Sequence, residues 1–208
     1  YGAGHEVEPG GEVERVWLRT ACAVADYHIE TTPPDGIPYW DTGAPRLGAI
    51  EEWSTMNADP FTAVEPVDSS AAAISAQGLL RLGKYLVTEA DRLAQIEVDL
   101  SGEGPQRHPA AEIRQQGERY TAAALGSAKT LFAEPYLSTD ATHQGILLHT
   151  VYHQPNGWDY RPDGSAVPYG ESCMWGDYHL IELAVMMQRL AAGERPQRFF
   201  DIDAGESL

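Results

Sequence analysis

Apolar residues return at helical spacing in several stretches of this chain, and long irregular segments separate those stretches. From residue 12 onward, apolar side chains recur every three or four residues, as on one face of an α-helix, until the Thr-Thr-Pro-Pro run that starts at Thr31. The string "DSSAAAISAQGLLRLGKYL" begins with residue types that commonly cap helices. We therefore expect one helix over about 12–30 and another that starts at Asp68 or Ser69.

The second half of the chain predicts two more helices. Residues 84–108 begin with an amphipathic pattern and end in the turn-rich string "SGEGPQRHP". A helix is expected over 109–134, where proline suits the first position, and a last one over 174–192, where Gly193 suits the end. Between these two helices, the string "LLHTVYH" suits a short strand.

Long loops are the other main feature. Residues 1–11 read as a Gly- and acid-rich loop and 194–208 as a polar tail, while 33–67 form an irregular stretch with four large aromatic residues, Tyr39, Trp40, Trp53 and Phe61. So many aromatic side chains are unusual in a disordered linker, so this stretch is expected to be ordered and either ligand-facing or core-capping. The pattern as a whole predicts an all-α chain of helical hairpins joined by long aromatic loops.

The charge of the chain excludes some partners. It has 31 acidic and 14 basic residues, a formal net charge of −17. A field of that sign repels phosphate backbones and anionic lipid surfaces, so neither a nucleic acid nor a membrane is expected as a partner. No apolar run approaches the roughly 20 residues of a membrane span.

The residues that could carry chemistry form few recognisable patterns. Cys22 and Cys173 lack paired spacing and are most simply buried core residues, with a disulfide as the alternative. The pairs His149/His153 and Asp177/His179 lack the spacing of a zinc site, so no metal is expected. The chain has no nucleophile elbow and no glycine-rich nucleotide motif.

Carboxylates beside aromatic rings remain as candidates, because sugar-cleaving sites use an Asp or Glu in such surroundings as a proton donor. Asp41 lies in "IPYWDTGAP", Asp68 at a predicted helix start, and Asp177 in "WGDYH". Each also has a structural interpretation, since Asp41 can brace its loop, Asp68 can cap a helix and Asp177 can sit in a first helical turn. The aromatic residues around "HQPNG" likewise suit either sugar stacking or capping of the core.

Four segments carry a resemblance to a known family. The strings "DGIPYWDTGAP", "EPVDSSAAAISAQGLLRL", "GILLHTVYHQPNG" and "ESCMWGDYHLIELAV" resemble, in order and rough spacing, the C-terminal half of the unsaturated glucuronyl hydrolases, glycoside hydrolase family 88. The resemblance implies an α/α toroid, the six-hairpin barrel, of which this chain supplies roughly the C-terminal half. It also implies that 1–208 form a single domain, with 12–192 as the best-matched part.

The same resemblance implies a reaction. Members of this family remove a 4,5-unsaturated uronic acid from the non-reducing end of oligosaccharides that polysaccharide lyases leave behind. An Asp protonates C4 of the vinyl ether and activates water for attack at C5, after which the hemiketal opens and releases the next sugar. The implied partner is an unsaturated uronyl oligosaccharide, no cofactor is implied, and family habit suggests the cytoplasm or periplasm.

The site residues can be carried over only in part. The family's catalytic Asp, its second pocket Asp and its Trp-Ala-Arg-Gly-Gln-Ala-Trp-like segment have no counterpart in this sequence, so the catalytic residue is unassigned. Tyr152 and His153 match the family's Val-Tyr-His segment, where an aromatic residue stacks on the sugar beyond the cleavage point. Together with Trp40 they are the expected substrate-binding residues. Asp41, Asp68 and Asp177 are expected to support those residues without touching the substrate, or to be structural.

Three expectations about the whole protein follow from the missing motifs. The chain is expected to be a fragment, or a half barrel that the N-terminal half of the same protein or another copy completes. The string "YHQPNG" contains no lysine, which favours unsulfated substrates. The alternatives are an unsaturated rhamnogalacturonyl-type hydrolase on the same barrel and a non-catalytic helical carbohydrate-binding or assembly module.

Overall fold

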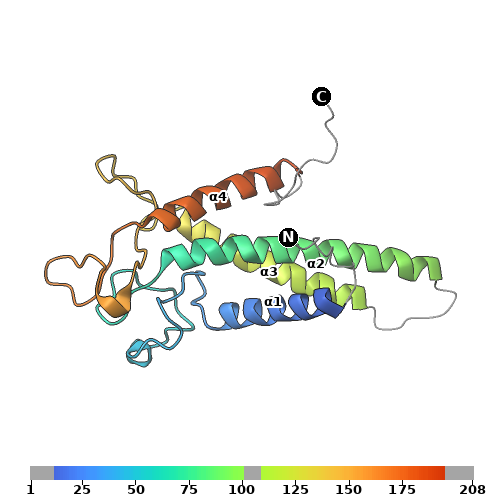
Figure 1. The fold of residues 1–208 in the computed structure, drawn as a ribbon, viewed down its shortest axis with the longest axis horizontal. Coiled ribbons are helices and arrows are strands. Elements are labelled where there is room, and N and C mark those ends of the chain that lie inside the picture. The colour runs from blue at the N-terminus through green and yellow to red at the C-terminus, as the bar shows by residue number, and fades with distance from the viewer. Residues whose placement is uncertain (1–11, 101–108, 195–208) are drawn as a thin grey trace, which may run out of the picture.

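The computed structural model describes residues 12–100 and 109–194, and these contain four α-helices (Figure 1). The helices are α1 (Glu12–Glu30), α2 (Ser69–Leu100), α3 (Pro109–Leu131) and α4 (Met174–Ala191), with short 3-10 helices η1 (Leu47–Ala49) and η2 (Gln154–Asn156) in the loops. The predictions of a loop over 1–11, a connector over 101–108 and a polar tail beyond 194 concern residues outside the described ones.

The predicted helix ends agree closely with the observed ones, for the local reasons that the sequence offered. Helix α4 ends just before Gly193, whose φ of 73° is a left-handed conformation that glycine adopts without strain. Helix α2 continues through Gly83 and residues 84–100, so the amphipathic stretch is the second half of one long helix.

Helices α2 and α3 form a closely packed antiparallel pair at the centre of the molecule (Figure 1). Alanines at 72, 73 and 76 on α2 and at 124 and 128 on α3 are completely buried. Farther along, Gly83 and Gly117 face one another so closely that a Cβ at Gly117 would lie 2.7 Å from the Gly83 carbonyl oxygen. Small residues at the contact therefore allow the two backbones to approach.

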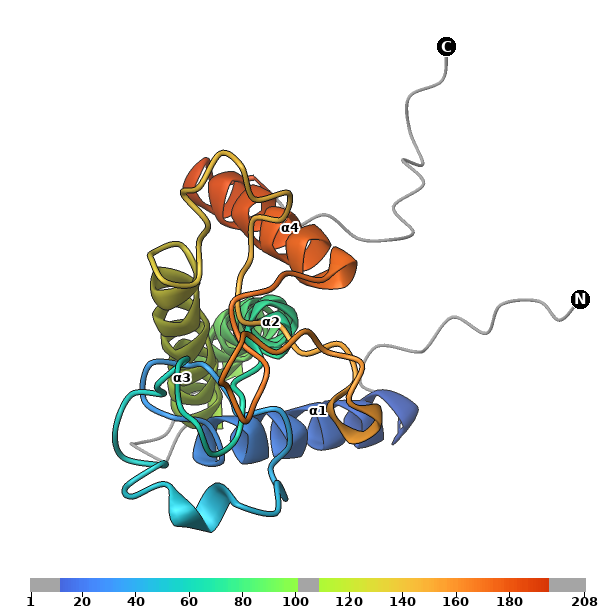
Figure 2. The ribbon, with the colours of Figure 1, turned by 90° about the vertical axis from the view of Figure 1, so that its left-hand side faces the viewer.

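Helices α1 and α4 flank this pair. Asp26 of α1 accepts hydrogen bonds from Arg119 (2.7 Å) and from the Tyr120 hydroxyl (2.8 Å) of α3. Gln77 of α2 donates to the main-chain oxygen of His179 in α4 at 2.8 Å. Figure 2, which looks along α2, shows α4 and α1 on different sides of it.

The outer helices leave apolar side chains uncovered. Side chains on one face of α1 and on one face of α4 are 43% to 84% exposed: Val16, Trp17, Val24 and Tyr27, and Met174, Tyr178, Ile181 and Val185. The sequence identified the apolar face of α1, but nothing among the described residues covers it.

The long loops 31–68 and 132–173 gather at one end of the helices, called here the loop end (Figures 1 and 2). The short strand suggested for "LLHTVYH" is wrong: within 12–100 and 109–194 the only β pairings are the isolated bridges Tyr39–Val67 and Leu137–Leu147. His149 has a left-handed φ of 63°, and its neighbours Leu148 and Thr150 donate to different segments, so no continuous ladder forms.

No helix among the described residues is long and apolar enough to cross a membrane.

Cys173 is buried and Cys22 is partly buried, and both thiols are free, so the disulfide alternative is wrong.

Candidate functional site

Three aromatic side chains at the loop end form a surface that we call the aromatic wall: Tyr152, Trp158 and Trp175. The Tyr152 and Trp175 rings stack with centroids 5.1 Å apart and planes inclined by 29°, and the Trp158 ring lies 6.0 Å from Tyr152. Tyr152 and Trp158 are 55% and 62% exposed, so they do not cap the core. The wall offers the flat apolar surface on which the C–H face of a sugar ring can stack.

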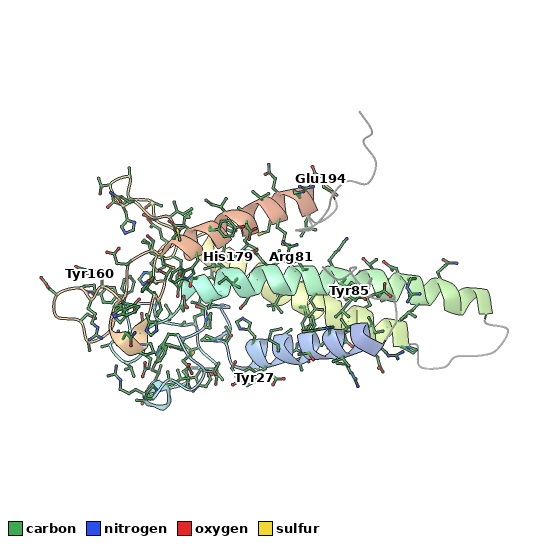
Figure 3. All side chains as sticks on the ribbon, viewed as in Figure 1. Tyr27, Arg81, Tyr85, Tyr160, His179 and Glu194 are labelled. Carbon is green, nitrogen blue, oxygen red and sulfur yellow. The ribbon has the colours of Figure 1, made fainter. Side chains whose placement is uncertain are left out.

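The aromatic wall lines a pocket of about 320 Å³. Two carboxylates, Asp159 and Glu171, also line it, and its described lining residues include no lysine or arginine. Tyr160 belongs to the same pocket, and Figure 3 shows it at the outer edge of the loop end. Apolar rings beside carboxylates favour an uncharged ligand over an anionic one at this position.

Hydrogen bonds hold the main chain of the loop that carries Tyr152. The Asp159 carboxylate accepts from the backbone N–H of Tyr152 and, at 3.0 Å, from that of His153. The His153 ring accepts from the N–H of Asn156 at 3.2 Å and lies 5.0 Å from the Trp158 ring. His153 thus braces the turn that presents Trp158.

The loop is also attached to the start of α2. Ser69 donates from its hydroxyl to the Leu148 carbonyl (2.6 Å) and from its N–H to the His149 carbonyl (3.1 Å). Asp68 accepts from the N–H of Val151 at 3.3 Å. The first turn of α2 therefore determines where the aromatic loop lies.

All three candidate carboxylates accept hydrogen bonds from backbone N–H groups. Asp41 accepts from Gly43 (2.6 Å) and braces its own turn. Asp177 accepts from two loop N–H groups, including that of Leu147 at 2.8 Å. Asp68 caps α2 by accepting from Ser70 N–H at 2.9 Å, and burial raises its pKa.

Trp40 lies elsewhere in the loop end. Its indole N–H donates to the Glu65 carboxylate at 2.7 Å, and Glu65 also accepts from the N–H of Arg46 at 2.8 Å. Trp40 is not among the described residues that line the aromatic pocket. The structure therefore brings Tyr152 into the pocket and leaves His153 outside the pocket lining, against the Trp158 ring, but it does not bring Trp40 to them.

His149 belongs to the interior of the loop end. It is 2% exposed and its ring lies 5.0 Å, 5.5 Å and 6.3 Å from the rings of Phe61, Tyr136 and Tyr169. Burial lowers the pKa of His149 to about 4, so the ring is neutral near pH 7. Over the described parts of the chain, no cluster of three or more His, Cys, Asp or Glu side chains could hold a metal ion.

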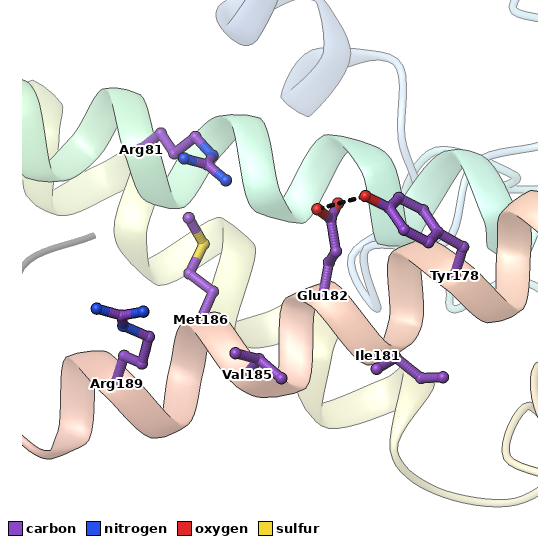
Figure 4. Close-up of a pocket in the computed structure, with 7 residues that line it drawn as sticks. All are labelled: Arg81, Tyr178, Ile181, Glu182, Val185, Met186 and Arg189. Atoms are coloured by element: carbon purple, nitrogen blue, oxygen red, sulfur yellow. Dashed lines mark hydrogen bonds between the residues drawn. The ribbon is translucent and has the colours of Figure 1, made fainter. Parts of the chain in front are cut away.

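Other hollows lie along the helices. A groove of about 180 Å³ runs between α2 and α4, where Arg81 of α2 faces Met186 and the Tyr178 hydroxyl donates to Glu182 at 2.8 Å (Figure 4). A larger one, of about 730 Å³, separates α1 from α2 near Tyr85. The smaller groove runs along the uncovered side of α4, whereas the larger one lies on the side of α1 that faces α2 and α3. Neither contains any of the candidate site residues named from the sequence.

Sequence reasoning missed Trp175 and Ser70 as parts of the site, and it considered Trp158 only as one of the aromatic residues around "HQPNG". Trp175 lies in the conspicuous "WGDYH" string, at the second position of α4. The sequence held one sign of its role. In antiparallel helical hairpins, the predicted helix starts near 68 and 174 and the aromatic loops that precede them must lie at the same end, which places Trp175 near the other aromatic residues.

Comparisons with known proteins agree with the resemblance in the four segments. Over 176 residues the chain is 27% identical to the unsaturated glucuronyl hydrolase of Bacillus sp. strain GL1, a match that covers 85% of this chain and 34% of that enzyme. This chain therefore spans about a third of the length of that curated relative. No protein-family model matches.

Two solved structures are similar in fold. One is the crystal structure of the unsaturated glucuronyl hydrolase of Bacillus sp. GL1, described as responsible for the degradation of glycosaminoglycan. The other is UGL with an Asp-to-Asn substitution and the oligosaccharide dGlcA-Glc-Rha-Glc. Each has a TM-score of 0.51, 23% identity, and coverage of 86% of this chain and 34% of the other. The predicted resemblance and fold class are confirmed: the described helices have the fold of part of that α/α barrel.

Proposed function

We propose that this chain, which resembles unsaturated glucuronyl hydrolases, forms part of a glycoside hydrolase. Its substrate would be an oligosaccharide that ends in a 4,5-unsaturated uronic acid, which the enzyme removes from the non-reducing end. The similarity to the Bacillus sp. GL1 enzyme supports the reaction class. The single observation that carries the proposal for this chain is the exposed aromatic wall at the loop end.

The proposed role of the aromatic wall is to bind the sugar beyond the cleaved bond. Tyr152, held against Trp175, would stack on that sugar. The pocket's carboxylates, Asp159 and Glu171, would disfavour a sulfate group there, because like charges repel in a partly desolvated site. We therefore propose a neutral, unsulfated sugar at this position.

In the proposed reaction, a carboxylic acid protonates C4 of the vinyl ether while its carboxylate form accepts a proton from the water that attacks C5. The hemiketal then opens and the next sugar leaves. Three candidate carboxylates are poorly suited to donate this proton, because each already accepts a hydrogen bond from a backbone N–H group: Asp41, Asp68 and Asp177. We place the proton donor on parts of the barrel other than these three residues.

The proposal also accounts for the uncovered sides of α1 and α4. In a closed barrel each helix has neighbours on both sides, whereas here Trp17 is 70% exposed and Met174 is 84% exposed. Burial of such apolar area contributes roughly 25 cal/mol per Å². Further helices, from the rest of the same barrel or from another copy, would therefore stabilise both sides.

Binding and turnover of an unsaturated glucuronyl disaccharide by the 208-residue chain test the proposal. Isothermal titration calorimetry measures binding, and the ultraviolet absorbance of the C4=C5 bond measures turnover. We expect the disaccharide to bind, and Tyr152→Ala to weaken that binding. Tyr178→Ala is the matched control, because Tyr178 is 54% exposed against 55% for Tyr152 but lies on α4 outside the pocket.

The outcomes separate the candidate functions. Binding that requires the C4=C5 bond and Tyr152 supports the hydrolase site, and the absence of turnover then agrees with a proton donor elsewhere. Enzymatic loss of absorbance would overturn the placement of the donor and make Asp41, Asp68 and Asp177 targets for substitution. Equal binding of the saturated disaccharide would favour the carbohydrate-binding module, and no binding would contradict the proposal.

A further inference from the structure

A chain of hydrogen bonds joins the first turn of α2 to the aromatic wall. The indole N–H of Trp175 donates to the hydroxyl of Ser70 at 3.2 Å, and that hydroxyl donates to Oδ1 of Asp68 at 2.6 Å. Ser70 is 1% exposed, so water does not compete for these bonds. The ring that Trp175 holds by stacking is Tyr152.

The same carboxylate oxygen also reaches the Tyr152 side of the stack. Oδ1 of Asp68 accepts from the N–H of Val151, the residue that precedes Tyr152, at 3.3 Å. One atom therefore restrains both partners of the stack. It acts on Trp175 through Ser70 and on Tyr152 through the main chain.

The direction of donation along this chain is fixed by chemistry. An indole N–H can only donate and an ionised carboxylate can only accept, so the single hydroxyl proton of Ser70 must point at Asp68. A lone pair of the hydroxyl then points at Trp175. This order leaves one orientation for the hydroxyl and favours one orientation for the indole ring.

Close contact between the starts of α2 and α4 keeps the groups in register. A Cβ at Gly176, next to Trp175, would lie 3.3 Å from the Ser70 Cβ and 2.8 Å from the Thr150 Cγ2. Gly176 thus allows α4 to press against the capped turn of α2, which brings the Trp175 indole within reach of Ser70.

We infer that Asp68 and Ser70 are positioning residues that set the orientation of Trp175 against Tyr152 and thereby the affinity of the aromatic wall for sugar. This inference rests on the proposed function for its ligand. It goes beyond helix capping, because the cap needs only the Asp68 carboxylate and backbone N–H groups, whereas the link to Trp175 needs the Ser70 hydroxyl.

Two neighbouring serines provide a matched test. Ser69 and Ser70 are both at most 1% exposed and both donate from their hydroxyls, but Ser69 donates to the Leu148 carbonyl and not toward Trp175. The first measurement is the affinity for an unsaturated glucuronyl disaccharide. Loss of the Ser70 link is expected to weaken binding about 3- to 10-fold in Ser70→Ala. Ser69→Ala keeps the bond from the Ser69 N–H to the His149 carbonyl that also holds the loop, so it is expected to change binding less than about 2-fold.

A second measurement reads the link without any ligand. The indole 15N–1H resonance of Trp175, assigned as the signal missing from Trp175→Phe, should shift in Ser70→Ala and stay in place in Ser69→Ala. Asp68→Asn keeps an oxygen that accepts from the Ser70 hydroxyl, so the Trp175 resonance should stay in place. Asp68→Ala removes that acceptor, so the resonance should shift. A chain that carries both Ser70→Ala and Trp175→Phe should bind the disaccharide no more weakly than a chain with Trp175→Phe alone.

The results can overturn the inference in two ways. If Ser69→Ala and Ser70→Ala weaken binding equally, Ser70 has only a structural role. The same follows if the Trp175 indole resonance does not shift in Ser70→Ala. If the unmodified chain binds no disaccharide, the proposed function fails. The resonance experiment still decides whether Ser70 positions Trp175.

Discussion

The contact between Gly83 of α2 and Gly117 of α3 leads to a sharp prediction about stability. A Cβ at residue 83 would lie 2.6 Å from the Gly117 carbonyl oxygen and 2.4 Å from the Thr121 Oγ1, whereas ordinary contacts begin near 3.4 Å. The Gly83→Ala substitution therefore forces the two backbones apart by about 0.8 Å (3.4 − 2.6). The Gly117 carbonyl is main chain, so this obstacle cannot be removed by rotating a side chain.

The magnitude follows from two opposing effects. A gap of that size forfeits roughly a quarter to a half of the dispersion energy of each flanking contact, and overpacking of a core costs up to about 3 kcal/mol. Alanine regains about 1 kcal/mol through its higher helix propensity. The free energy of unfolding should therefore fall by about 2 kcal/mol.

The matched control is Gly78→Ala on the same helix. Gly78 is exposed, and a Cβ there meets no atom within 4 Å, so only the propensity effect remains. This variant should be more stable by about 1 kcal/mol. The two alanine substitutions are thus predicted to have opposite signs.

Urea-induced unfolding followed by far-ultraviolet circular dichroism measures both variants, and thermal unfolding should move by about 2–4 °C per kcal/mol in a chain of this size. A Gly83→Ala chain at least as stable as the unmodified one would refute the reasoning. It would mean that α2 and α3 do not meet at Gly83 and Gly117.

Three other predictions concern the loop end. Burial lowers the pKa of His149 from 6.5 to about 4, so protonation of this ring favours the unfolded chain. The free energy of unfolding should therefore be highest above about pH 6.5 and fall as the pH decreases toward 4. His149→Gln should lessen that fall, as measured by urea unfolding at several pH values. Trp40→Phe should cost about 1–3 kcal/mol by removing a donor to the buried Glu65 while disaccharide affinity stays the same, and loss of affinity without loss of stability would place Trp40 in the sugar site after all. Asp177→Ala should lower the free energy of unfolding by about 1–3 kcal/mol, since two backbone N–H groups lose their acceptor, and an unchanged urea midpoint would contradict that role.

Local chemistry made most helix boundaries predictable. The Asp68 cap, the proline at the start of α3 and the left-handed Gly193 each act within a few residues, so their effect can be read from the sequence. The suggested strand at "LLHTVYH" failed because the partners of its N–H groups are distant segments. His149 in particular adopts a left-handed φ inside a cluster of rings that no local pattern specifies.

The site shows the same division. The sequence alone determined the four helical segments, the acidic charge and the capping role open to Asp68, and it carries the resemblance from which Tyr152 is predicted to contact sugar. Only the tertiary structure decided that Trp175, rather than Trp40, stacks on Tyr152, and that Ser70 links this stack to Asp68. The reason is physical: propensity and capping depend on neighbours along the chain, whereas stacking and buried hydrogen bonds depend on which helix ends the packing of α2 against α4 brings together.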